Sequence, residues 1–123
     1  MGASTAGKSV LIIEDDDDVR GALAAFLEAE GYSVLEASDG AVGLQHLRAR
    51  SVCLILLDLW MPGMNGWEFR AEQVKDAELA AVPVVVITAD HAAARKTAAL
   101  GVSGCMTKPI EFPELLAYVG RYC

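Results

Sequence analysis

Polar and charged residues follow the apolar runs of this sequence, at the points where the runs end. Glu14 and Asp15 come directly after one apolar run. Asp58 and Thr88 each come directly after another run, and Lys108 follows a further one. Carboxylates brought close together repel one another, which raises their pKa values unless a cation lies between them. Mg²⁺ is a suitable cation because it prefers oxygen ligands and retains several waters. The residues therefore predict a magnesium site bordered by a lysine.

The same residues are suited to phosphoryl transfer. Asp58 is the expected nucleophile, and it would form an aspartyl phosphate. A metal ion on one side of Asp58 and Lys108 on the other would offset the charge that develops on the transferring group. Thr88 then offers a hydroxyl to the phosphoryl oxygens. This chemistry requires that the side chains meet at one place in the fold.

Short apolar runs alternate with amphipathic segments along the chain. The pattern predicts strands at residues 10–13, 33–37, 52–57, 84–87 and 103–107. It predicts helices at residues 17–30, 40–50, 91–100 and 113–122, and a further helix that begins near Trp67. Five strand-helix pairs indicate a doubly wound α/β fold with a five-stranded parallel sheet and five helices. Ligands of such sheets bind at the carboxyl ends of the strands, where the polar residues lie.

Four segments at these strand ends carry the most specific sequence signal. They are Val10-Leu-Ile-Ile-Glu-Asp15, Leu54-Ile-Leu-Leu-Asp58-Leu-Trp-Met-Pro62-Gly-Met-Asn-Gly66, Val85-Val-Ile-Thr88-Ala and Thr107-Lys108-Pro109. Together they resemble the response-regulator receiver family of two-component signalling, which is CheY-like and has a flavodoxin-like topology. The resemblance covers nearly the whole chain.

The resemblance implies a role for each residue of the metal site. Asp58 matches the phosphoacceptor, and it ligates Mg²⁺ together with Asp15 and the main-chain carbonyl of Trp60. Glu14 matches the residue that usually reaches the ion through water. Mn²⁺ is expected to substitute for Mg²⁺.

The resemblance also implies a switch. Thr88 matches the hydroxyl that moves toward the phosphoryl group, and Lys108 matches the lysine that binds phosphate, commonly before a cis peptide bond to Pro109. The chain departs from the pattern at Cys105, the switch position where receivers usually place Tyr or Phe. We expect Cys105 to pack as a small core residue rather than to sense redox state.

A phosphorelay function follows from these correspondences. A histidine kinase or a phosphotransfer protein would donate the phosphoryl group, and a downstream protein would bind the switched surface. The domain itself would catalyse its phosphorylation and dephosphorylation, without being a conventional enzyme. Because Cys105 stands where receivers usually have an aromatic residue, one alternative stays open. It is a receiver-like module that binds proteins without phosphorylation. Phosphatases with an aspartate nucleophile require D-x-D, whereas Trp60 stands two residues after Asp58.

Composition excludes several other functions. The net charge of −7, with no basic cluster, argues against direct binding of nucleic acid. No apolar run approaches the length of a membrane span, so we expect a cytoplasmic protein without membrane insertion. The cysteines Cys53, Cys105 and Cys123 lack C-x-x-C spacing, which favours unpaired thiols. The sequence does not determine the oligomeric state.

The N-terminal residues are expected to form a flexible tail at positions 1–8, before a domain at positions 9–123. Residues 2–9 match the phosphate-binding pattern G-x-x-x-x-G-K-[ST]. That loop needs a strand before it and a helix after it, whereas here a predicted strand follows. We therefore do not expect a nucleotide site at this end of the chain.

Overall fold

A parallel β-sheet forms the centre of the computed structural model, which describes residues 7–123. Its five strands lie in the order β2-β1-β3-β4-β5. They are β1 (Ser9–Ile13), β2 (Val34–Ala37), β3 (Val52–Asp58), β4 (Val84–Thr88) and β5 (Gly104–Thr107). All pairings are parallel, which confirms the predicted sheet. The expected tail at positions 1–8 and the N-terminal phosphate-loop pattern lie largely outside the described residues.

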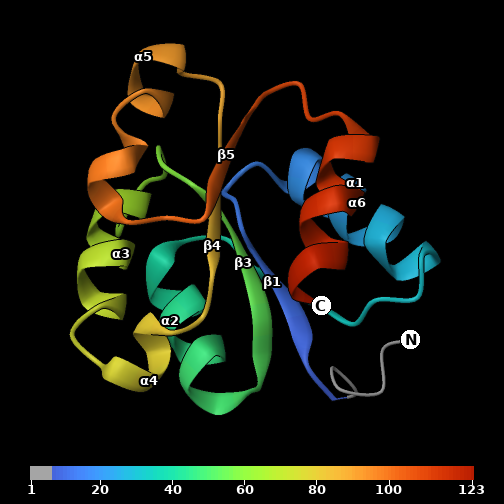
Figure 1. Ribbon diagram of the computed structural model, residues 1–123, viewed down its shortest axis with the longest axis horizontal. Coiled ribbons are helices and arrows are strands. Elements are labelled where there is room, and N and C mark those ends of the chain that lie inside the picture. The colour runs from blue at the N-terminus through green and yellow to red at the C-terminus, as the bar shows by residue number, and fades with distance from the viewer. Residues whose placement is uncertain (1–6) are drawn as a thin grey trace.

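Helices cover both faces of the sheet. One face carries α1 (Asp17–Ala29) and α6 (Phe112–Tyr122), and the other carries α2 (Gly40–Ala49) and α3 (Gly66–Gln73) (Figure 1). Successive residues of a strand point to opposite faces, so Val10 and Ile12 join one core cluster while Leu11 and Ile13 join the other. The three central strands are fully buried, which explains why they are almost continuously apolar.

The helices differ from the prediction in two places. Within residues 7–123 there are six α-helices rather than five, because a short helix α4 (Ala77–Ala80) follows α3. Asp76 begins α4 by accepting hydrogen bonds from the main-chain N–H groups of residues 78 and 79. This additional N-cap was not predicted from the sequence.

The single helix predicted at residues 91–100 is also wrong. It is divided into α5 (His91–Ala94) and a 3₁₀ helix, η2 (Thr97–Leu100). The Thr97 hydroxyl donates to the main-chain oxygen of Ala94 at 2.8 Å, and that oxygen would otherwise accept an α-helical hydrogen bond from residue 98. The main-chain N–H of Lys96 bonds to the oxygen of Ala93, three residues back, so the α-helical pattern ends before η2.

The cysteines also correct the prediction. Cys53 and Cys123 form a disulfide, with their Cα atoms 5.5 Å apart. Cys53 lies near the start of β3 and Cys123 follows α6, so 70 positions separate them along the sequence. The spacing of the cysteines therefore gave no indication of the pair. Cys105 is free and half-buried, as expected for a packed side chain.

Candidate functional site

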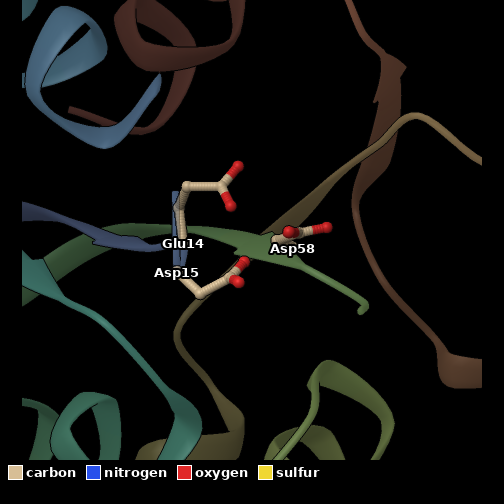
Figure 2. Close-up of side chains that lie close together, drawn as sticks. All are labelled: Glu14, Asp15 and Asp58. Atoms are coloured by element: carbon tan, nitrogen blue, oxygen red, sulfur yellow. The ribbon is translucent and has the colours of Figure 1, made fainter. Parts of the chain in front are cut away.

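Three carboxylates meet at the carboxyl edge of the sheet. Glu14 and Asp15 follow β1, and Asp58 ends the neighbouring strand β3. Ile13 pairs with Leu57, so the next residue on each strand, Glu14 and Asp58, lies at the same level. One carboxylate oxygen of each of the three residues lies within 4.8 Å of the others, and both side chains from β1 extend toward Asp58 (Figure 2). The predicted convergence of these carboxylates is confirmed.

The cluster carries an excess of negative charge, and two of its three carboxylates are buried. Glu14 is completely buried and Asp58 is 5% exposed, whereas Asp15 is open to solvent. Burial, supplemented by the nearby Asp58, raises the pKa of Glu14 even though Lys108 opposes the shift. Burial and the adjacent Glu14 raise the pKa of Asp15. A hard divalent cation suits this set of oxygen ligands, and it would stabilise the charged forms of Glu14 and Asp15.

Lys108 supplies the positive charge of the site. Its ammonium donates a hydrogen bond to Glu14 and lies 3.5 Å from Oδ2 of Asp58. Burial lowers the pKa of Lys108, but the two carboxylates outweigh burial and raise it, so the ammonium stays charged. The peptide bond from Lys108 to Pro109 is cis, as the resemblance to receivers implies. The pairing with Glu14 was not predicted, because Glu14 was expected to act on the metal ion alone.

Thr88 lies on the strand next to Asp58. It ends β4 and is completely buried, one residue beyond Ile87, the partner of Asp58 in the sheet. Its main-chain oxygen accepts a hydrogen bond of 2.8 Å from the main-chain N–H of Lys108. This hydrogen bond holds the main chain of Lys108, which follows β5, against the end of β4.

Comparison with known proteins identifies this arrangement. The family described as response regulator receiver domain matches residues 10–120. The chain belongs to this family. It is 33% identical over 109 residues to protein PilH of Pseudomonas aeruginosa, an alignment that covers 87% of this chain and 90% of PilH. The chain therefore has the receiver fold of two-component signal transduction.

Two further relatives show how far the likeness extends. The chain is 30% identical over 120 residues to the autoinducer sensor kinase/phosphatase CqsS of Vibrio cholerae, covering 94% of this chain and 17% of CqsS. It therefore spans only a small part of that relative. A crystal structure of a putative response regulator from Chloroflexus aurantiacus matches with a TM-score of 0.86 at 26% identity, covering 94% of this chain and 96% of that one. Within residues 7–123, no helix is long and apolar enough to cross a membrane.

The loop after β3 approaches the receiver site closely. A Cβ atom on Gly66 would lie 2.5 Å from the main-chain oxygen of Asp58, so only glycine fits there without displacing the main chain. The main-chain N–H of Trp60 lies 3.5 Å from Oδ1 of Asp58, a long contact. The role of the Trp60 carbonyl as a metal ligand stays a prediction.

Two features of this receiver involve its departures from the family pattern. The Trp60 indole N–H donates to Oδ2 of Asp90 at 3.1 Å, a contact that was not predicted from the sequence. The pKa of Asp90 is lowered, because the main-chain N–H of Ala93 and then the indole stabilise its charge.

At the switch position, burial raises the pKa of the Cys105 thiol. A protonated thiol is a weak nucleophile, which agrees with the expected packing role.

Proposed function

We propose that this receiver domain, expected to comprise residues 9–123, accepts a phosphoryl group on Asp58 with a bound divalent cation. The observation that carries the proposal is the position of Asp58 between a carboxylate cluster and the Lys108 ammonium. Mg²⁺ is the proposed ion and Mn²⁺ a substitute. Asp15, Asp58 and the Trp60 carbonyl would hold it directly, with Glu14 acting through water. Bound there, the ion would neutralise charge on the phosphoryl oxygens.

The proposed transfer is an in-line displacement. A carboxylate oxygen of Asp58 attacks the phosphorus of a phosphohistidine or of a small acyl phosphate, forming a new P–O bond. The bond from phosphorus to the leaving group breaks, and the leaving group takes its electron pair. Lys108 attracts the equatorial oxygens because its ammonium lies beside Asp58. Thr88 then donates its hydroxyl to the transferred group.

The proposed output is a change of protein-binding surface. The phosphoryl group adds about −1.5 to −2 charges at the strand ends. Motion of Thr88 toward it would alter the neighbouring loop and α5. A histidine kinase or phosphotransfer protein is the proposed donor, and a downstream protein is the proposed target in the cytoplasm. The relative CqsS is a sensor kinase/phosphatase, which supports a partner of this class.

Incubation with acetyl phosphate and Mg²⁺ is expected to add one phosphoryl group to the intact chain. Mass spectrometry under non-reducing conditions measures the gain, which chelation with EDTA should abolish. Asp58→Asn should also abolish it, because an amide is a poor nucleophile. Asp18→Asn is the matched control, since Asp18 is exposed on α1 outside the cluster.

Absence of the gain would contradict the proposal if the folded chain also remained unmodified by a phosphorylated histidine kinase. That result would favour the alternative, a receiver-like module that binds proteins without phosphorylation. Cys105 at the switch position is the observation that keeps this alternative in view.

Mg²⁺ is expected to stabilise the folded chain, because it relieves repulsion among the carboxylates. At a free concentration about a hundred times the dissociation constant, binding adds about 2.7 kcal/mol to the free energy of unfolding. Thermal unfolding with Mg²⁺ and with EDTA measures the difference. Asp15→Asn should remove most of it, while Asp18→Asn should keep it. An equal gain in both variants would place the ion elsewhere.

A further inference from the structure

Trp60 and Asp90 connect the two loops that leave the phosphoacceptor edge of the sheet. Trp60 follows Asp58 by two positions, and Asp90 follows Thr88 by two positions. Asp58 pairs with Ile87 in the sheet, so both loops begin at neighbouring points. The 3.1 Å hydrogen bond from the Trp60 indole to Asp90 joins them.

Asp90 is bonded to the proposed site as well as to Trp60. Its main-chain N–H donates to the hydroxyl oxygen of Thr88 at 3.1 Å. Its other carboxylate oxygen accepts from the main-chain N–H of Ala93 at 3.0 Å, which caps the start of α5. A continuous set of hydrogen bonds therefore runs from the buried Thr88 hydroxyl through Asp90 to the Trp60 indole.

Within the described residues, Asp90 accepts the one hydrogen bond that the Trp60 ring makes. The side chain is 53% exposed, unusually open for so large an apolar group. Its one aromatic neighbour within residues 7–123 is Trp67, whose ring lies edge-on with the centroids 6.2 Å apart. Loss of the Asp90 hydrogen bond would thus leave the indole free to move.

Binding of a phosphoryl group would compete with this arrangement. The Thr88 hydroxyl is a single group on a β-branched side chain, and turning it toward phosphoryl oxygens turns it away from the Asp90 N–H. Asp90 would then lose the hydrogen bond that its main-chain N–H donates, one of four that fix it. The Cys105 thiol cannot provide the aromatic movement that receivers usually have at that position.

We propose that Trp60 and Asp90 form a latch that holds the unphosphorylated conformation and opens when Thr88 engages the phosphoryl group. Trp60 is then the aromatic side chain that responds to the state of Asp58. The inference rests on the proposed phosphorylation of Asp58. Because coupling is reciprocal, a broken latch makes the phosphoryl-bound conformation easier to reach.

The fluorescence of Trp60 tests the opening. The chain has two tryptophans, so Trp67→Phe leaves Trp60 as the single emitter. Acetyl phosphate with Mg²⁺ should shift its emission to longer wavelength and increase quenching by acrylamide, in the same sample whose intact mass shows the phosphoryl group. A gain in mass with unchanged emission and quenching would overturn the latch and leave the proposed function intact. Absence of the mass gain, also with phosphorylated kinase, would overturn both.

The affinity for beryllofluoride, a stable phosphoryl analogue, tests the coupling. Calorimetry in the presence of Mg²⁺ should show binding about threefold to tenfold tighter in Trp60→Phe, which loses the donor and keeps the Asp90 cap. Asp90→Ala should change affinity in the same direction. Asp90→Asn has only one side-chain oxygen, so it can cap α5 or accept from the indole but not both, and its affinity should also increase. Asp18→Asn, exposed on α1, should stay within about twofold of the native chain. Unchanged affinity in Trp60→Phe would contradict the latch.

Discussion

Reduction of the disulfide between Cys53 and Cys123 is expected to lower the free energy of unfolding by about 4 kcal/mol. The bond joins positions 70 residues apart, and closing so long a loop removes much of the conformational freedom of the unfolded chain. The folded chain changes less, because Leu115 and Val119 of α6 are completely buried against the sheet. We therefore expect a loss of stability without a loss of the fold.

Urea unfolding with and without a dithiol reductant measures this loss. The double variant Cys53→Ala, Cys123→Ala should show the lower stability and no response to the reductant. Cys105→Ser is the matched control, since Cys105 is free and should leave the response unchanged. Thiol titration of the unfolded chain should find one thiol before reduction and three after it. A reductant that exposes three thiols without lowering stability would contradict the prediction.

The strands and the site could be predicted from sequence for one physical reason. A strand buried on both faces must be almost entirely apolar, so the first polar residue after it marks the sheet edge. Parallel strands bring these edge residues together, which is why Glu14, Asp15 and Asp58 were expected to meet and do meet. The Lys108 ammonium was expected beside Asp58 and lies 3.5 Å from it.

The features that sequence did not predict depend on contacts between distant positions or on single side chains. The pairing of Cys53 with Cys123 requires that the start of β3 lies beside the end of α6. Beside the break after α5, the hydroxyl of Thr97 donates to the Ala94 carbonyl. Apolar periodicity contains no information on either contact. The same holds for the hydrogen bond between Trp60 and its partner on the next loop.

Lys108→Met is expected to remove both phosphorylation and about 3 kcal/mol of stability near neutral pH. The side chain of Glu14 is completely buried, and without its ammonium partner it would be an unpaired charge in the interior. Breaking one side of a buried ion pair costs about 3–5 kcal/mol. The lower end applies because Lys108 is 21% exposed, so water can enter and solvate the remaining carboxylate.

The loss should depend on pH with a definite sign. Burial raises the pKa of Glu14 and Lys108 lowers it, so removing the lysine raises the pKa further. The folded variant then binds the proton more tightly than the unfolded chain, and its stability increases as pH falls toward that pKa. Protonated Glu14 is neutral and needs no cation. The difference between native chain and variant should be largest near neutral pH and should shrink in mild acid.

Removing both charges separates the structural role of Lys108 from its proposed chemical role. The double variant Glu14→Gln, Lys108→Met contains no buried unpaired charge, so in EDTA it should recover most of the stability that Lys108→Met loses. It should remain unphosphorylated, because no ammonium then offsets charge beside Asp58. Lys75→Met is the matched control: its ion pair with Glu72 is exposed, so it should change stability by less than about 0.5 kcal/mol. Equal losses in Lys108→Met and Lys75→Met would show that Glu14 does not depend on its lysine. Phosphorylation of the double variant would show that phosphoryl transfer does not depend on Lys108.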